Sequence, residues 1–250
     1  MKHPYIHVDH SGGRLMPVLN IAMVGSDDLA REIAKPTDQR DVHTYVHKES
    51  DADGPRILSI IRPAKYPERL RPFLNALSAA RVGIIEIERI DATLGEALVA
   101  FASSNLTKGM AIINAPDGEW VDEDQAKMLF KQAGLGEWTF AKGDGIELRT
   151  ILYGFMDSIA DELKANAEAP LVIPVDQHFN VKGIGLVAIG YVQSGTVNVH
   201  DELVLLPANG TGNAKSLQVM DDDVPAARAG DRVGLALPRN IRRAAVDRLI

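Results

Sequence analysis

The pattern of apolar residues changes near Ala169, and this change divides the chain into two parts. Up to Ala167, short apolar runs alternate with segments whose apolar residues repeat at helical spacing. Runs this apolar are typical of strands that are covered on both faces. Strands that alternate with helices predict a doubly wound α/β sheet. The runs are VLNIAMV (18–24), RILSII (56–61), VGIIEI (82–87), GMAII (109–113) and EWTF (137–140).

The segments between these runs carry helix signals. Thr93 and Glu96 have the spacing of a capping box, Asp122 can cap the next helix, and Gly134 can end it. The alternating segment VHTYVH (42–47) is expected to be an edge strand. Apolar residues at helical spacing predict two more helices, one with Leu70, Phe73, Leu74 and Leu77 around Pro72, and one that starts near Gly145 with Ile146, Leu148, Leu152, Phe155 and Ile159.

The part after Ala169 consists of short strand-like segments separated by glycine turns. Turn signals occur at Lys182-Gly183, Ser194-Gly195 and Ala229-Gly230-Asp231, among others. Short strands at regular spacing predict a small closed all-β barrel. The expected organisation is a flexible N-terminal segment (1–16), an α/β domain (17–167) and a β-barrel (170–250).

Composition excludes several classes of protein. The chain has no cysteine, which excludes disulfides, thiolate catalysis and zinc ribbons. No window approaches the roughly 18 consecutive apolar residues of a membrane span, and the N-terminus lacks the apolar core of a signal peptide. We therefore expect a cytosolic protein without a membrane partner.

The net charge of −7 is unevenly distributed along the chain. Residues 170–250 contain eight acidic and eight basic residues, so the first 169 residues carry the whole excess. Four arginines lie close together near the C-terminal end, and they are candidates for contacts to RNA phosphates, although for four arginines alone a solvated surface is the preferred interpretation. They are Arg239, Arg242, Arg243 and Arg248.

The second part resembles domain 2 of elongation factor Tu and its relatives. The stretch VIPVDQHFNVKGIGLVAIGYVQSGTVNVHDELVLLP, followed by AARAGDRVGLAL, carries the glycine pattern of that family, with His200 in place of one glycine. The matching positions are Phe179, Val181, Gly183, Gly185, Gly190, Gly195, Val197, Asp201, Gly230, Asp231 and Gly234. The resemblance implies a barrel preceded by a GTP-binding domain, here in a degenerate form like that of archaeal relatives of the selenocysteine-specific factor. It also implies that the family's third domain is missing.

The phosphate-side motifs of such a GTPase have no good match. HVDHSGG (7–13) is similar to G-H-V-D-H-G-K-[ST], but no strand precedes it, and glycines replace its lysine and threonine. The first strand leads instead into Gly25-Ser26-Asp27-Asp28, where two carboxylates complement the helix dipole and repel phosphate. Arg62 and Lys65 stand where the family has the residues of D-x-P-G, and they cannot hold Mg²⁺ in that way.

The guanine-side motifs are half kept. Asn114 and Asp117 match N-K-x-D, with Ala115 in place of the lysine. Ala141 and Lys142 match S-A-K, with Phe140 in place of the serine. The same Asn-x-Pro-Asp-Gly residues are also ordinary turn formers. Asn114, Asp117, Ala141 and Lys142 are therefore the candidate nucleotide-contacting residues.

Three functions are compatible with these observations. The first is a non-catalytic, translation-linked binding protein without cofactor or metal, whose partner is ribosomal RNA, tRNA or a translation-related protein. The second is a residual GTP- or GDP-binding protein. The third is a structural or assembly scaffold, because fold does not decide function. The N-terminal residues His3, His7, Asp9 and His10 are not expected to form a metal site.

Overall fold

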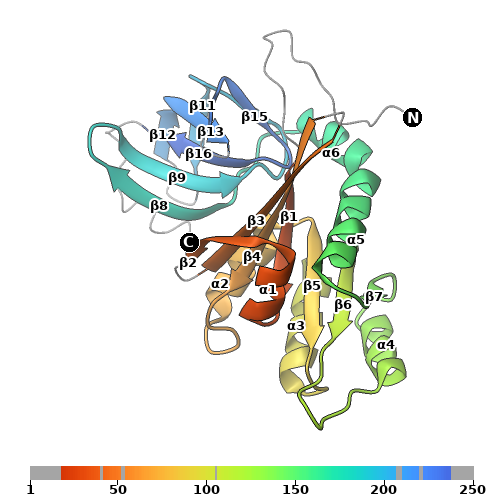
Figure 1. The fold of residues 1–250 in the computed structure, drawn as a ribbon. Helices are drawn as coiled ribbons and strands as arrows, with labels where there is room; N and C mark the ends of the chain where they lie inside the picture. The colour runs from red at the N-terminus through yellow and green to blue at the C-terminus, as the bar shows by residue number, and fades with distance from the viewer. Residues whose placement is uncertain are drawn as a thin grey trace. The chain divides into compact units, whose positions relative to one another are not determined.

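A seven-stranded mixed sheet organises the first of the two compact units into which the chain divides. This unit contains Leu19–Ser158, and the second contains the described residues from Ile159 onward (Figure 1). The structure is a computed structural model that describes residues 18–39, 42–51, 54–104, 106–206, 210–219 and 222–237.

The strands of the first unit follow the order β2-β3-β4-β1-β5-β6-β7. β1, β5, β6 and β7 run parallel to one another in succession, whereas β2, β3 and β4 form an antiparallel meander. Almost all side chains of β1 and β5 are buried, as expected for strands covered on both faces. The strands are β1 (Val18–Val24), β2 (Lys35–Gln39), β3 (Val42–Asp51), β4 (Gly54–Pro63), β5 (Val82–Ile87), β6 (Gly109–Ile113) and β7 (Thr139–Ala141).

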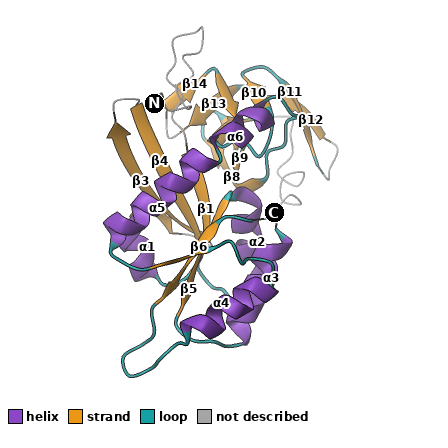
Figure 2. Ribbon diagram, turned by 90° about the vertical axis from the view of Figure 1, so that its right-hand side faces the viewer, coloured by secondary structure: helices purple, strands orange, loops and turns teal. Residues whose placement is uncertain are grey.

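Helices cover both faces of this sheet. Figure 2 shows α1 and α5 on one side and α2, α3 and α4 on the other, which is the doubly wound arrangement that the sequence predicts. None of the helices in the described ranges is long and apolar enough to cross a membrane. The helices are α1 (Asp27–Ile33), α2 (Leu70–Ala79), α3 (Ala92–Ser103), α4 (Glu123–Gln132) and α5 (Gly145–Ser158).

Local signals place most helix ends correctly. Asp122 caps α4 by accepting from the N–H of Asp124 at 2.9 Å, and Gly134 follows its end with φ +86°. Pro72 is the third residue of α2, where the backbone N–H has no helical partner, so proline is tolerated.

Three expectations about this unit are wrong in detail. Asp91, not a Thr93–Glu96 capping box, caps α3, accepting from the N–H of Leu94 at 2.9 Å. VHTYVH lies in β3, which pairs with β2 on its outer side, so β2 and not β3 is the edge strand. Ile146 is 65% exposed, because it lies two positions before the buried Leu148 and so points to the other side of α5.

An indole ring occupies the space beside two glycines on neighbouring strands. Gly83 in β5 pairs with Gly109 in β6. A Cβ built at Gly83 would lie 2.2 Å from the ring of Trp138, and one at Gly109 would lie 2.6 Å from it. Trp138 is 4% exposed and donates from Nε1 to the carbonyl of Leu106 at 3.1 Å, so the ring has no room to retreat.

The second unit contains a five-stranded antiparallel sheet and two two-stranded antiparallel sheets. The order of the larger sheet is β14-β13-β16-β9-β8, and the smaller sheets are β10-β15 and β11-β12. The α/β fold followed by an antiparallel β domain, as predicted, is confirmed. The elements are α6 (Ala160–Ala167), β8 (Val175–Val181), β9 (Gly185–Tyr191), β10 (Thr196–Asn198), β11 (Glu202–Leu205), β12 (Gly210–Asn213), β13 (Ser216–Val219), β14 (Asp222–Val224), β15 (Ala226–Arg228) and β16 (Arg232–Ala236).

Turn geometry explains the glycine pattern of this unit. Gly183, Gly195 and Gly230 have φ of +92°, +78° and +100°, which glycine adopts without steric cost. His200, at the position where the family pattern has a glycine, has φ +77° and is the single non-glycine residue with positive φ in the described ranges. Its N–H donates to the carbonyl of Ala214 at 2.7 Å, which helps to hold this unfavourable conformation.

Two glycine substitutions in the α/β unit are expected to have opposite effects. Gly83→Ala should lower the free energy of unfolding by about 3 kcal/mol, because the added methyl overlaps the Trp138 ring. Gly95→Ala is the matched control in the first half of α3, where a Cβ meets nothing within 4 Å. It should raise the same quantity by about 0.5–1 kcal/mol through helix propensity. Urea unfolding followed by tryptophan fluorescence reports this unit alone, since Trp120 and Trp138 both lie in it. Equal effects of the two changes would contradict the packing described for Trp138.

Candidate functional site

The carboxyl ends of β1 and β5 mark a point where chain connections diverge. β1 leads into α1 on one face of the sheet, and β5 leads into α3 on the other (Figure 2). In open α/β sheets, ligands bind in the crevice that such a divergence creates. The functional site is therefore sought at this edge of the sheet.

A buried carboxylate connects three strands at this edge. Glu86, in β5, is 7% exposed. One of its oxygens accepts from the backbone N–H of Ser26, directly before α1, and the other accepts from the side-chain amide of Asn114 at 2.7 Å. Asn114 follows β6, and its own N–H donates to the carbonyl of Ile87 at 3.0 Å. Glu86 thus holds the ends of β1, β5 and β6 together.

The connection from β1 to α1 is short and closely packed. It consists of Gly25 and Ser26 alone. The Ser26 side chain caps α1 by accepting from the N–H of Leu29 at 3.1 Å. A Cβ at Gly25 would lie 2.8 Å from the Cβ of Glu86, so this position must be glycine for Glu86 to approach the helix.

Asp27 and Arg62, next to this connection, are both hydrogen-bonded within the chain. Asp27 accepts hydrogen bonds from the hydroxyl of Tyr45 and from the guanidinium of Arg31, and these bonds lower the pKa of its carboxyl. Burial and the bond to Asp27 raise the pKa of Tyr45 to about 12. Arg62, at the end of β4, donates from Nε to the carbonyl of Gly25 at 2.6 Å.

The two loops that were predicted to contact guanine lie at this same edge. β6 and β7 are parallel neighbours, so the residues that follow them emerge together. After β6 the chain makes a turn in which the N–H of Glu119 donates to the carbonyl of Pro116 at 2.9 Å and Gly118 has φ +81°. Asp117 is an exposed residue of this turn and makes no hydrogen bond or ion pair with the other described residues.

The residues after β7 are engaged in local contacts. Ala141 is 4% exposed and belongs to the strand itself. The ammonium of Lys142 lies 2.7 Å from a carboxylate oxygen of Glu123, and that of Lys127 lies 2.8 Å from the other. Hydrogen bonds from Lys127 and Lys142 lower the pKa of Glu123 to about 2. Lys142 therefore points to the first residue of α4.

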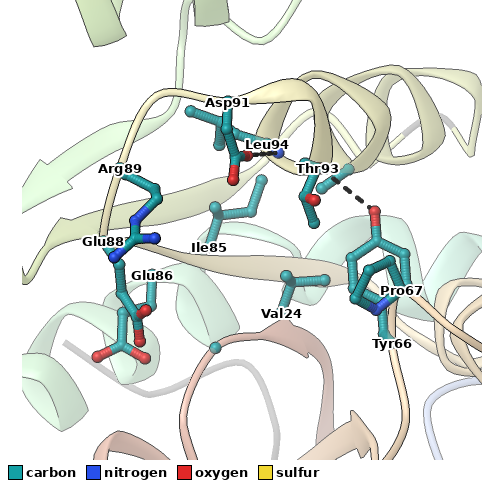
Figure 3. A pocket seen from close by; sticks show the side chains of 12 residues that line it. Val24, Tyr66, Pro67, Ile85, Glu86, Glu88, Arg89, Asp91, Thr93 and Leu94 are labelled. Carbon is teal, nitrogen blue, oxygen red and sulfur yellow. Dashed lines mark hydrogen bonds between the residues drawn. The ribbon is translucent and has the colours of Figure 1, made fainter.

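A pocket of about 320 Å³ opens beside the Glu86 network. Figure 3 shows Glu86, Glu88 and Arg89 at one end of it and Tyr66 and Pro67 at the other. The hydroxyl of Tyr66 donates to the carbonyl of Thr93 at 3.3 Å, which joins the segment before α2 to the first turn of α3.

Several sequence candidates lie outside the described residues. These are the motif HVDHSGG (7–13) and the four C-terminal arginines, Arg239, Arg242, Arg243 and Arg248. Within the ranges that the structure describes, no three His, Asp or Glu residues come close enough to hold a metal ion.

The sequence interpretation missed Glu86, although a signal was present. The segment VGIIEI (82–87) is a buried strand with a single charged residue. A carboxylate in such a strand has to find hydrogen-bond donors, and this alone marks Glu86 as the centre of a polar network.

Removal of the Glu86 carboxylate should destabilise the α/β unit. In Glu86→Ala the N–H of Ser26 and the amide of Asn114 lose their acceptor, so the free energy of unfolding should fall by about 2–3 kcal/mol. The control is Glu88→Ala, two residues along, where the side chain is exposed and makes no hydrogen bond or ion pair with other described residues. It should change stability by less than about 0.5 kcal/mol. The measurement is urea unfolding followed by tryptophan fluorescence, and similar losses in both variants would refute the central role of Glu86.

Comparison with known proteins finds a family model for part of the second unit and relatives for most of the chain. Residues 185–238 match the family model of elongation factor Tu domain 2. An uncharacterized protein of Methanocaldococcus jannaschii is 28% identical over 223 residues, which is 89% of this chain and 68% of that protein. The selenocysteine-specific elongation factor of the same organism is 42% identical over 96 residues, covering 38% of this chain and 20% of that factor.

Solved structures share the fold over nearly the whole chain. A bacterial selenocysteine-specific elongation factor superposes with a TM-score of 0.71 and 21% identity, covering 92% of this chain and 44% of that one. The factor SelB of Methanococcus maripaludis, in complex with the GTP analogue GPPNHP, gives a TM-score of 0.67 and 21% identity, with coverages of 91% and 54%. The chain thus spans about half the length of these two structures. It is a relative of the elongation factor Tu and selenocysteine-specific elongation factor family, with an α/β unit followed by a domain of the elongation factor Tu domain 2 type.

Proposed function

We propose that this chain is a translation-elongation-factor-like protein of the cytoplasm that does not hydrolyse GTP and acts as a non-catalytic binding protein. The α/β unit is, in this proposal, a pseudo-GTPase domain without a phosphate-binding loop. Its partner is ribosomal RNA, tRNA or a translation-related protein, as the family relationship suggests. It uses no cofactor.

The contact between Glu86 and Ser26 is the observation that carries the proposal. A phosphate-binding loop needs several glycines and free backbone N–H groups after the first strand, with a lysine to neutralise the phosphate. Here the N–H of Ser26 is already bonded to a carboxylate, and Gly25 has no space for even a methyl group. A nucleotide phosphate at this place would meet the negative charges of Glu86 and of Asp27 and Asp28.

The arrangement around Arg62 supports the same proposal. A GTPase binds Mg²⁺ partly through the aspartate of its second motif, and the metal stabilises the charge that develops during hydrolysis. The corresponding position is occupied by Arg62, whose guanidinium donates to the carbonyl of Gly25. A cation fixed there opposes the binding of a second cation.

Residual binding of GTP or GDP is the second candidate function, and Asp117 is the observation that favours it. Its carboxylate is exposed beside the β6 end and is available to accept from the two N–H donors of guanine. Against it, the amide of Asn114 is bonded to Glu86 and the ammonium of Lys142 to Glu123. Ala141 offers only its backbone.

Nucleotide titration tests the proposal directly. With fluorescent analogues of GDP and GTP, with and without Mg²⁺, we expect no binding up to about 1 mM nucleotide, which corresponds to less than about 4 kcal/mol of binding free energy. Asp117→Ala and Asn114→Ala should leave this result unchanged. The matched control is the surface change Asp124→Ala. Micromolar binding that is abolished by Asp117→Ala but not by Asp124→Ala would refute the proposal and support the second candidate function.

Ribosome binding tests the partner. We expect the full chain to co-sediment with ribosomes, and the fourfold Arg→Gln variant of the C-terminal arginines to bind more weakly and with a smaller salt dependence. Each lost phosphate contact lowers the slope of log K against log salt by about 0.7–0.9. The charge-matched control replaces four exposed cations of the α/β unit by Gln, namely Lys35, Lys48, Arg71 and Lys131. An equal loss in the control would show that the contact is not localised to the C-terminal arginines.

A further inference from the structure

The pocket beside Glu86 combines an apolar wall with an excess of negative charge. Its volume of about 320 Å³ lies in the range of small-molecule sites. The charged groups that line it are three carboxylates, Glu86, Glu88 and Asp91, and one guanidinium, Arg89. The apolar part of its lining is Val24, Pro67, Ile85, Leu94 and Ala97.

The single positive group of the pocket has a partner outside it. Arg89 lies 3.1 Å from a carboxylate oxygen of Glu119, which is not a lining residue. Glu88, by contrast, makes no hydrogen bond or ion pair with the rest of the described residues. Asp91 uses one carboxylate oxygen to cap α3. Acceptor capacity at this end of the pocket therefore exceeds the donors that the chain supplies.

Acidic residues at the start of α3 also affect the phenol of Tyr66 at the opposite end of the pocket. Burial raises the pKa of Tyr66 to about 12, and the charges of Glu96 and Asp91 contribute in the same direction.

The carboxylates of the pocket do not form a metal-binding cluster. Among the residues that the structure describes, no three carboxylate or imidazole groups are placed to hold a metal ion. A compact cation such as Mg²⁺ needs several oxygen ligands at short distance. The lining therefore favours an extended cation with an apolar body.

We propose that this pocket binds a small organic cation, a primary amine carried on an apolar or aromatic body. The ammonium lies near Glu88 and Asp91, and the body lies against Val24, Ile85 and Leu94. This site goes beyond the proposed function, because it requires neither nucleotide nor a translation partner, and each proposal can fail without the other.

Three compounds of one shape and different charge test the proposal. Tyramine carries an ammonium, tyrosol carries a neutral hydroxyl, and 4-hydroxyphenylacetate carries a carboxylate on the same phenol frame. Each is titrated into the ¹⁵N-labelled full chain, and amide chemical shifts give the dissociation constant and the location. We expect tyramine to bind with a dissociation constant of about 0.1–1 mM, as its size allows. It should shift Gly25, Glu88 and Leu94, bind at least about tenfold more tightly than tyrosol, and weaken with added salt.

Variants of Glu88 separate the pocket from non-specific attraction. Glu88→Gln should weaken tyramine about three- to tenfold and leave tyrosol unchanged, and Glu88→Lys should abolish tyramine binding. The matched control is Glu137→Gln, which removes one exposed carboxylate before β7, at the opposite edge of the sheet, and should have no effect. The proposal is overturned if tyrosol or the carboxylate binds as tightly as tyramine, if Mg²⁺ displaces tyramine at equal concentration, or if Glu137→Gln weakens binding as much as Glu88→Gln.

Discussion

The hydrogen bonds of one buried carboxylate determine what the carboxyl edge of the α/β unit can do. Glu86 lies at the end of a strand whose other side chains are apolar, and burial of a charge is unfavourable unless donors surround it. The donors come from Ser26 and Asn114, which lie 60 and 28 residues away in the sequence. Because both contacts depend on the positions of β1 and β6, the register of three parallel strands and the chemistry of the edge are coupled through this one side chain.

This coupling bears directly on the function that is proposed for the α/β unit. In an α/β fold of this type, the N-terminus of the first helix is the natural place for an anion, which normally comes from a ligand. Here the anion is part of the chain, because Glu86 accepts only from neutral N–H donors, and Asp27, which is bonded to Tyr45 and Arg31, adds a second carboxylate. The proposed loss of GTP hydrolysis and the proposed preference for an organic cation both follow from an edge that already contains its own negative charge.

Much of the architecture follows from local patterns, whereas the site does not. The apolar runs and the cap at Asp122 predict the order of strands and helices, because burial and capping depend on neighbouring residues. The capping role of Asp91 was missed because two polar residues compete for one helix start, and three-dimensional packing decides between them. The bond between Asn114 and Glu86 joins separate strands, so no spacing in the sequence reveals it. The expected similarity to domain 2 of elongation factor Tu is confirmed, because its glycines mark turns that are local.

The packing of the Trp138 ring against Gly83 and Gly109 restricts which substitutions this sheet can accept during evolution. The indole and the two missing side chains occupy one shared volume. A larger residue at Gly83 or Gly109 fits only if a smaller residue replaces Trp138. A smaller residue at position 138 leaves a cavity unless a larger residue replaces one of the glycines. Substitutions at these three positions are therefore coupled. Relatives with a different residue at one of them are expected to have compensating substitutions at the others.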